Sequence, residues 1–499
     1  MITQPKKLRH IKHLELTLDM LNRLYYFDSR DMDILISYAS FFIDDNGGQS
    51  RDALAWLKRM NGKLMMNVSE IPLADMKGWH FDQSMNLMHE SGRFFSIQGV
   101  KVSTNTGQVK EWDQPIIHQP EIGILGFICQ KQEGVLKFLV QAKIEPGNIN
   151  HVMLSPTVQA TKSNFTQAHN GKRPEYLKYF IDLKHANIIV DQLQSEQGSR
   201  FLKKRNRNII LEIDENEDME VLENYYWLSL GQIKYLLQCD NLVNMDARSV
   251  LSCLKTRMAS GLSGKLTDFS KSGVFNKFQW DLIQSLMNNQ EPIYTKAQII
   301  SWFTNLKTIN ELSVEDCGLK DLRDWIIGDK DISHKNAKYF QVIGVKTVAE
   351  SREVASWCQP MIKQYDAGIV GFLIKKFNNI YHVLIQAKME VGNFDILEMA
   401  PTVQCITGSY INPEYTVPFL DFFTERKGVV HYDNLQSEEG GRFFREQNRY
   451  MVIEVDDGFE EDINDRYIWM TLRQIKEFIQ FNNYLNIEAR SLLTCLLPI

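Results

Sequence analysis

Two copies of one polar, glycine-centred motif carry the residues best suited to bind or transform a small anionic ligand. LQSEQGSRFLKKRNR spans 193–207, and LQSEEGGRFFREQNR spans 435–449, which is 242 positions later. In each copy a Gln-Ser-Glu triplet precedes a turn with glycine, an arginine follows the turn, and an Asn-Arg pair closes the motif. Glycine lets a ligand come close to the main chain, and an arginine guanidinium matches phosphate or carboxylate oxygens. One copy alone would be typical of a solvated turn, but the duplication favours a functional role.

The motif supplies its candidate residues in matched pairs. Glu196 and Glu438 are candidate general bases, because a carboxylate in a partly dry pocket can have a raised pKa. The candidate substrate-binding residues are Gln194, Ser195, Arg200, Asn206, Arg207, Gln436, Ser437, Arg442, Asn448 and Arg449. For the arginine of each Asn-Arg pair, the alternative is a structural ion pair with Glu212 or Glu454.

Other repeated segments add candidates at strand-like positions. Thr157 and Gln159 in SPTVQA, and Thr402 and Gln404 in APTVQC, either face a ligand or form the polar side of a strand. Lys143 and Lys388, in the repeated triplet Gln-Ala-Lys, either place positive charge near a bound ligand or simply end a strand. Tyr176 and Tyr415, in the repeated triplet Pro-Glu-Tyr, are alternative bases. We expect no histidine to recur at matching positions, so a histidine base would be confined to one copy.

Composition narrows the class of protein. The chain has 499 residues, 44% of them hydrophobic, which favours a globular protein with two or more domains. Its net charge of -6 argues against a general nucleic-acid-binding surface. The seven cysteines include no CxxC pair, which is typical of reduced thiols rather than of disulfides or a zinc site. No apolar stretch has the length of a membrane span or signal peptide, so we expect a cytoplasmic protein.

The duplication extends through most of the chain. FFSIQGVKV at Phe94 matches YFQVIGVKT at Tyr339, an offset of 245, and both are typical of strands. Helical patterns open each copy, and others close it, such as YYWLSLGQIKYLLQ and YIWMTLRQIKEFIQ. We therefore predict an α/β (α+β) protein with a first repeat and helical lead-in at 1–254, a linker and helix at 255–295, and a second repeat at 296–499.

These residues resemble one family, the NDP-hexose 2,3-dehydratases of deoxysugar biosynthesis, over nearly the whole chain. The most specific stretches are SPTVQATKSNF with HNGKRPEYLKYF, and LQSEEGGRFF with QNRYMVIEVD. The resemblance implies two tandem Nudix-like α/β/α repeats, a homodimer, and an NDP-4-keto-6-deoxyhexose substrate, most often linked to dTDP. It implies loss of water across C2 and C3, giving a 3,4-diketo-2,6-dideoxy sugar. No cofactor is expected, since the chain has neither a dinucleotide-binding GxGxxG nor a P-loop.

The metal-binding part of a Nudix hydrolase is missing from both copies. Gly392 and Glu398 have its opening spacing, but no Arg-Glu and Glu-Glu pair follows, and Met153 replaces the glutamate in the first copy. We therefore predict no metal site. Two alternatives remain: a sugar-nucleotide-binding protein that has lost catalysis, or a true Nudix-type pyrophosphatase.

Overall fold

The computed structural model describes residues 37, 48–162, 173–184, 186–254, 276–287, 291–349, 355–406, 417–459 and 463–496. Tyr415, one of the predicted bases, lies outside these ranges. Within them, no helix is both long and apolar enough to cross a membrane.

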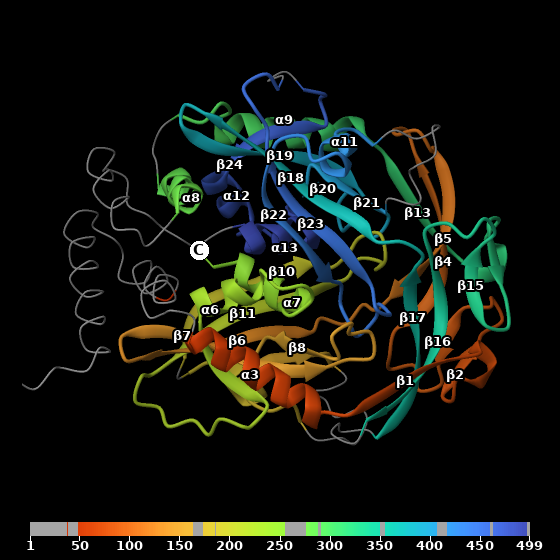
Figure 1. The fold of residues 1–499 in the computed structure, drawn as a ribbon. Coiled ribbons are helices and arrows are strands. Elements are labelled where there is room, and N and C mark those ends of the chain that lie inside the picture. The colour runs from red at the N-terminus through yellow and green to blue at the C-terminus, as the bar shows by residue number, and fades with distance from the viewer. Residues whose placement is uncertain are drawn as a thin grey trace, which may run out of the picture.

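Each repeat is built around a seven-stranded mixed sheet (Figure 1). In the first repeat the order is β10-β11-β6-β7-β12, with β8 on β7 and β9 on β6. These strands are β6 (Ile124–Gln132), β7 (Val135–Ile144), β8 (Val152–Ser155), β9 (Val158–Ala160), β10 (Asn187–Ser195), β11 (Arg205–Ile213) and β12 (Tyr225–Ser229). Strands β6 and β11 are parallel, and the other pairs are antiparallel.

The second repeat has the same sheet in the order β20-β19-β18-β23-β22, with β21 on β18 and β24 on β19. Its strands are β18 (Gly368–Phe377), β19 (Ile380–Met389), β20 (Leu397–Ala400), β21 (Val403–Ile406), β22 (Val429–Ser437), β23 (Gln447–Glu454) and β24 (Tyr467–Thr471). Here β18 and β23 are the parallel pair. The two Gln-Ser-Glu triplets begin at the equivalent ends of β10 and β22. The predicted α/β (α+β) class and the duplication are therefore confirmed.

Two smaller sheets join the repeats by exchanging strands. Strand β1 (Met66–Ile71) of the first repeat pairs with β16 (Phe340–Ala349) of the second, and β13 (Leu312–Cys317) pairs in return with β4 (Ser96–Thr104). The remaining strands are β2 (Trp79–Phe81), β3 (Leu87–His89), β5 (Glu111–His118), β14 (Trp325–Ile327), β15 (Asp331–His334) and β17 (Ser356–Gln364). Short 3-10 turns, η1 (Leu73–Asp75) and η3 (Leu319–Asp321), follow β1 and β13. Each repeat thus contributes one strand to a sheet of the other repeat.

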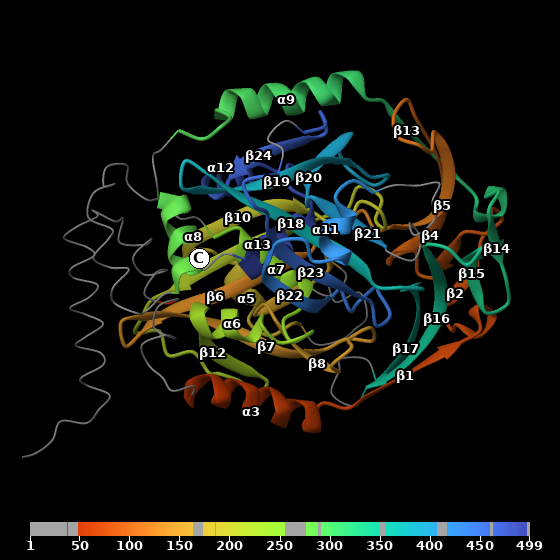
Figure 2. The same cartoon turned by 45° about the horizontal axis from the view of Figure 1, so that its top comes forward.

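Helices cover the outer faces and fill the centre. The lead-in helices α3 (Gly48–Lys63) and α9 (Lys296–Ile309) lie on opposite outer sides of the molecule (Figure 2). The others are α5 (Leu177–Ile181), α6 (Leu230–Leu236), α7 (Met245–Ser252), α8 (Lys277–Met287), α11 (Leu420–Thr424), α12 (Leu472–Phe478) and α13 (Ile487–Leu496). Helices α7 and α13 pack against each other, and one buried apolar cluster includes residues of both repeats.

The predicted closing helices begin later than the sequence pattern suggested. The aromatic residues at the start of YYWLSLGQIKYLLQ form strand β12, and Ser229 then caps helix α6 by accepting a hydrogen bond from the Gln232 amide. Thr471 does the same between β24 and α12. Bulky aromatic residues favour the strand, and a hydroxyl side chain satisfies the free amides at a helix N-terminus. The apolar periodicity alone did not reveal this change.

Two buried arginines tie the repeats together at the centre. Arg248 of α7 and Arg490 of α13 are 0% exposed. The Nη2 atom of Arg248 donates to the Ser437 carbonyl at 2.6 Å, and Nη2 of Arg490 donates to the Ser195 carbonyl at 2.5 Å. Each Gln-Ser-Glu triplet is thus held by a helix of the other repeat. Charged groups buried in this way are costly to leave unpaired, which makes the contact between repeats specific.

Candidate active site

A cavity of about 890 Å³ lies between the large sheet of the first repeat and the exchanged sheets. This is the size of pockets that enclose drug-sized or nucleotide-sized ligands. Both repeats line it. The first contributes Lys143, Glu145, Gln159, Lys204, Asn206 and Asp246, among others, and the second contributes Trp357, Gln359, Glu439, Gly441 and Arg442.

Amide side chains hold two carboxylates at this cavity in fixed positions. The Oε1 atom of Glu145 accepts from Gln159 Nε2 at 3.1 Å and lies 3.3 Å from Lys143 Nζ. The Gln159 carbonyl oxygen in turn accepts from Asn244, the N-cap residue of α7, at 3.1 Å. In the neighbouring strand, Asn206 Nδ2 donates to Glu196 Oε1 at 2.6 Å. Hydrogen bonds and an ion pair therefore hold the polar side chains of the cavity wall in place.

The arginine of the second motif copy is equally well positioned. The Arg442 guanidinium lies 4.1 Å above the centre of the Phe95 ring. Its Nε and Nη2 atoms donate to Gln119 Oε1 at 3.3 and 3.2 Å, and Nη1 donates to the Gly441 carbonyl at 2.8 Å. Stacking and a planar fork both require arginine rather than lysine. A cation fixed in this way can receive an anionic group without losing much conformational freedom.

The backbones of the two repeats approach each other closely at Gly147 of the first repeat and Gly440 of the second repeat's motif. The Gly147 amide donates to the Gly440 carbonyl at 2.8 Å. A Cβ atom on Gly147 would lie 1.7 Å from the Phe443 carbonyl oxygen, and one on Gly440 would lie 2.1 Å from Asn148 Oδ1. We expected the glycines of the motif to admit a ligand. Instead, they admit the other repeat, and this contact carries Arg442 to the cavity of the first repeat.

Burial and mutual repulsion shift the acidity of the carboxyl groups here. Desolvation, and next the charge of Glu439, raise the pKa of Glu196 to about 7. The pKa of Asp246 is raised well above its ordinary value, first by burial and then by Glu439, Glu196 and Glu145. Burial also raises the pKa of Glu439, although Arg442 opposes that shift. Carboxyl groups whose environments push their pKa values apart are suited to acid and base roles.

The cavity brings together only some of the residues that the sequence singled out. Lys143, Gln159, Asn206 and Arg442 line it, and Glu196 lies directly behind Asn206. Their counterparts in the second repeat keep the same arrangement, with Arg200 4.3 Å above the Phe340 ring. Lys388 there donates to the Gln404 carbonyl, Gln404 donates to Glu390, and Asn448 donates to Glu438.

The other candidates hold the fold together. Thr157 and Thr402 bridge neighbouring strands through their hydroxyl groups, which accept from the amides of Ile128 and Leu373. Gln194 donates to the Ile479 carbonyl, Gln436 donates to the Leu237 carbonyl, Ser195 donates to Glu398, and Ser437 lies against the Met153 sulfur. Tyr176 donates to the Glu220 carbonyl beyond the cavity. None of these seven is among the residues that line the cavity.

Arg207 and Arg449 form ion pairs away from the cavity. The Nη2 atom of Arg207 lies 2.6 Å from Asp191 Oδ2, and Nε of Arg449 lies 2.5 Å from Asp433 Oδ1. The structural alternative therefore describes them better than substrate binding does. The partner, however, is the aspartate on the adjacent strand and not Glu212 or Glu454, because β10 and β22 pair directly with β11 and β23.

Several residues at the cavity were missed. Glu145 recurs as Glu390 in the segments IEPGN and MEVGN, so the duplication itself was a usable signal. His89, which lines the cavity, recurs as His334 at the offset of 245, and the expectation that no histidine recurs was wrong. Both histidine rings pack edge-on against a tryptophan, Trp79 and Trp325 respectively. Asp246 and Glu439 carried no sequence signal of their own.

The two repeats differ in charge at equivalent positions. Lys204 corresponds to Glu446 and Glu439 to Gln197, whereas Asp246 corresponds to Glu488 and remains a carboxylate. The cavity of the first repeat thus has three cations nearby, Lys143, Lys204 and Arg442. At the equivalent place in the second repeat, one of the three cations is exchanged for a carboxylate. At these positions the first cavity therefore carries more positive charge than its counterpart, which favours an anionic ligand.

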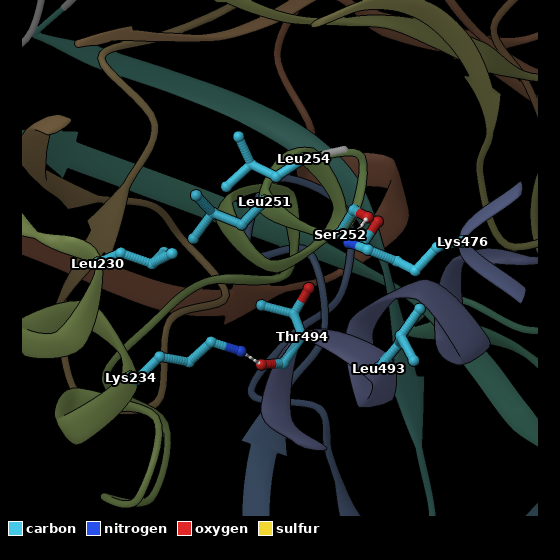
Figure 3. A pocket seen from close by; sticks show the side chains of 8 residues that line it. All are labelled: Leu230, Lys234, Leu251, Ser252, Leu254, Lys476, Leu493 and Thr494. Carbon is cyan, nitrogen blue, oxygen red and sulfur yellow. Dashed lines mark hydrogen bonds between the residues drawn. The ribbon is translucent and has the colours of Figure 1, made fainter. Parts of the chain in front are cut away.

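A second and much smaller cavity lies where α6, α7, α12 and α13 meet (Figure 3). Its volume is about 10 Å³, which is room for roughly one water molecule. Lys234 and Lys476 reach it from the two repeats, and Lys234 donates to the Thr494 carbonyl. This cavity is too small for a sugar nucleotide.

Comparison with known proteins gives matches to one family. The family model for NDP-hexose 2,3-dehydratase matches residues 50–254 and again 296–496. A protein of Saccharopolyspora spinosa named dTDP-4-dehydro-6-deoxy-alpha-D-glucopyranose 2,3-dehydratase is 41% identical, with 88% of this chain and 90% of the relative covered. Proteins of the same name from Amycolatopsis orientalis and Streptomyces violaceoruber are each 38% identical, covering 90% and 88% of this chain and 90% and 95% of their own lengths. The chain belongs to the NDP-hexose 2,3-dehydratase family.

Proposed function

We propose that the protein removes water across C2 and C3 of dTDP-4-keto-6-deoxyglucose in the cavity of the first repeat. The relatives named above act on this sugar nucleotide according to their names. The observation that carries the proposal is the cavity of about 890 Å³, where fixed cations and carboxylates from both repeats meet. Binding the diphosphate requires the cations, and the elimination requires the carboxylates.

The reaction follows from the ketone at C4 of the substrate. The ketone acidifies the proton on C3, so a base of ordinary strength can remove it and form an enolate. Positive charge close to the C4 oxygen stabilises that enolate, and Lys143, which lies in the wall of the cavity, is suited to this role. The hydroxyl on C2 then leaves as water with a proton from an acid. The resulting enol changes to the 3,4-diketo-2,6-dideoxy sugar.

The two ends of the substrate need different surroundings. Arg442 is the proposed ligand of the diphosphate, because its guanidinium is held in place by Phe95 and Gln119. Asn206 and Gln159 present amides that hold the carboxylates in position around the sugar. Uncharged parts of the ligand have Trp79 and Trp357 to contact at the wall formed by the exchanged sheets.

Incubation with dTDP-4-keto-6-deoxyglucose tests the function directly. We expect a product lighter by one water, seen by mass spectrometry. In D2O the product should carry deuterium at C2 and should have lost the original C3 hydrogen. Release of a nucleoside monophosphate on addition of Mg²⁺ would instead favour the pyrophosphatase alternative. Binding without any turnover would favour a sugar-nucleotide-binding protein.

We also propose a homodimer in the cytoplasm. The family resemblance implies the dimer, and the seven cysteines, all of them free, suit a reducing compartment. Light scattering during size-exclusion chromatography should give about twice the chain mass of 58.1 kDa. A mass of one chain at micromolar concentration would contradict the dimer.

A further inference from the structure

The carboxylates of the active-site cavity fall into two classes according to what holds them. Glu145 accepts from Gln159, and Glu196 accepts from Asn206, so both have structural partners. Across the part of the chain that the structure describes, the carboxylate oxygens of Asp246 and Glu439 have no hydrogen bond or ion pair. Both residues nevertheless line the cavity, and Asp246 is only 3% exposed. Burying a carboxyl group without a hydrogen-bond partner costs free energy. A ligand that forms hydrogen bonds with these groups would explain why they lie here.

The backbone fixes both of these side chains in place. Asp246 lies in the first turn of α7, where Asn244 caps the helix by accepting from the Ala247 amide at 2.9 Å. Glu439 precedes a tight turn in which its carbonyl accepts from the Phe443 amide at 2.9 Å. One carboxyl group thus comes from each repeat, and the two converge on one cavity. Among charged groups, Glu439 has the largest effect on the pKa of Asp246.

Resting on the elimination proposed above, we infer that Glu439 removes the C3 proton and that Asp246 protonates the departing C2 hydroxyl. Burial raises the pKa of Glu439, and the cations Arg442, Lys204 and Lys143 oppose that rise, Arg442 most strongly. Asp246 instead faces the charges of Glu439, Glu196 and Glu145, which favour its protonated form. Glu439 thus has an arginine as its strongest charged neighbour, whereas the strongest charged neighbours of Asp246 are carboxylates, and this contrast assigns the base to Glu439 and the acid to Asp246.

The steps balance in atoms and electrons. Glu439 takes the C3 proton, and the electrons of that C–H bond form the C3=C4 bond while the C4 oxygen becomes negative. The C4 carbonyl then forms again, the C2=C3 bond forms, and the C2–O bond breaks. The proton of Asp246 joins the leaving hydroxide, so one water molecule departs. The remaining enol loses its hydroxyl proton and gains a proton at C2 from solvent, and no oxidant or reductant is consumed.

The second repeat lacks this pair of groups. Gln197 occupies the position equivalent to Glu439, and its amide donates to Glu438. An amide cannot accept a proton as a carboxylate does, so the Glu439→Gln substitution copies a natural difference between the repeats. Glu488, the counterpart of Asp246, has no such base beside it. It therefore provides a matched control in the same fold, at the same helix position and with the same burial.

The experiment compares Glu439→Gln, Asp246→Asn and the control Glu488→Gln. Each variant is given dTDP-4-keto-6-deoxyglucose in D2O, and two rates are measured: exchange of the C3 hydrogen, by NMR, and loss of water, by mass spectrometry. Affinity for dTDP and the thermal transition show whether the site and the fold persist. Glu439→Gln should lose both rates at least 10²-fold, the usual size of a lost general base. Asp246→Asn should lose water elimination by a similar factor but still exchange the C3 hydrogen, and the control should match the wild type.

The outcomes separate this inference from the function on which it rests. If the wild-type protein releases no water from the substrate, the proposed function is wrong. If the wild type is active and either variant eliminates water at a near-normal rate, the assignment of that residue is overturned. Exchange that survives in Glu439→Gln but disappears in Asp246→Asn would reverse the two roles.

Discussion

At the scale of single residues, equivalent positions in the two repeats have kept their geometry but changed their charge. Arg442 above Phe95 and Arg200 above Phe340 lie at similar distances from the ring centres, 4.1 and 4.3 Å. Lys204, by contrast, has Glu446 as its counterpart, whose pKa burial raises to about 8. Conserved geometry follows from the duplication, whereas the change of charge indicates where a diphosphate is expected to bind.

The first prediction concerns Arg442, compared with an arginine of the same motif that lies elsewhere. Arg442→Ala should weaken binding of dTDP by about 1.5–3 kcal/mol, the size of a lost hydrogen bond to a charged group. Arg449→Ala is the matched control, because that side chain is paired with Asp433 away from the cavity. Isothermal titration calorimetry measures both affinities. Equal affinity in the two variants, with the fold intact, would remove Arg442 from the binding site.

The second prediction is that turnover survives exhaustive treatment with EDTA. The glutamate that would open a Nudix metal site is replaced by Met153 in the first repeat. In the second repeat Glu398 is buried and accepts a hydrogen bond from Ser195 at 2.7 Å, so it has a structural partner. Lysine side chains provide the positive charge that an enolate needs. Loss of activity in EDTA, restored by Mg²⁺ or Zn²⁺, would count against this mechanism.

Much of the site could be read from the sequence because the duplication marked it. Lys143, Gln159, Asn206 and Arg442 were identified through their counterparts, and all four line the cavity. The same method failed where the repeats differ. Asp246 is replaced by Glu488 and Glu439 by Gln197, so a search for identical residues at equivalent positions of the two repeats does not find them. The repeated Gln and Ser residues of the motif, in turn, make recurring contacts between the repeats, because a duplicated interface is repeated just as a duplicated site is.

At the scale of elements, strand order was beyond the reach of the sequence. Strands β1 and β13 occupy equivalent places after the lead-in helices, and each pairs with the other repeat's sheet. Their partners β16 and β4 have nearly the same residue pattern, QVIGVKT and SIQGVKV. Pairing β1 and β13 with strands of their own repeat, or with strands of the other repeat, would bury the same apolar residues. The sequence pattern therefore does not decide between these two pairings. The tertiary contacts of the two repeats decide it.

The central helices lead to a prediction about pH and stability. Lys476 of α12 donates to the Ser252 carbonyl at the end of α7 at 2.9 Å, and Lys234 of α6 donates to the Thr494 carbonyl of α13. Burial lowers the pKa of Lys234 to about 7 and that of Lys476 to about 8. The unfolded chain binds these protons more tightly, with a pKa near 10.5. As far as these two lysines affect it, the free energy of unfolding is therefore highest above about pH 10.5 and decreases as the pH falls toward 7.

Replacing one of these lysines tests that statement. Lys234→Met should stabilise the protein relative to the wild type at pH 7, by an amount set by roughly 1.4 kcal/mol per unit of pKa shift. The lost hydrogen bond to the Thr494 carbonyl subtracts about 1–3 kcal/mol at any pH. The difference in Tm between variant and wild type should thus become smaller, or reverse, at pH 9.5. Lys58→Met, on the exposed face of α3, is the control and should show no such trend. A Tm difference for Lys234→Met that does not depend on pH would contradict the lowered pKa.

At the scale of the whole molecule, exchanged strands and buried side chains interlock the two repeats. Strand exchange and the buried pair Arg248 and Arg490 make each repeat complete the other. The active-site cavity follows the same rule, since Glu439 and Arg442 reach it from the second repeat. The cavity is therefore lined by residues of both repeats.

Dividing the chain tests this interdependence. A fragment of residues 1–265 lacks the partner of β1 and has Arg248 without the Ser437 carbonyl, so we expect it to be insoluble or unfolded alone. The fragment of residues 266–499 should behave in the same way because β13 and Arg490 lose their partners. Expressed together, the two fragments should assemble and recover turnover, measured as water loss from the sugar nucleotide. A second fragment carrying Arg442→Ala should assemble equally well but bind dTDP more weakly, which shows that it supplies part of the site. A soluble and fully active fragment of residues 1–265 would instead mean that the first repeat builds the site without help.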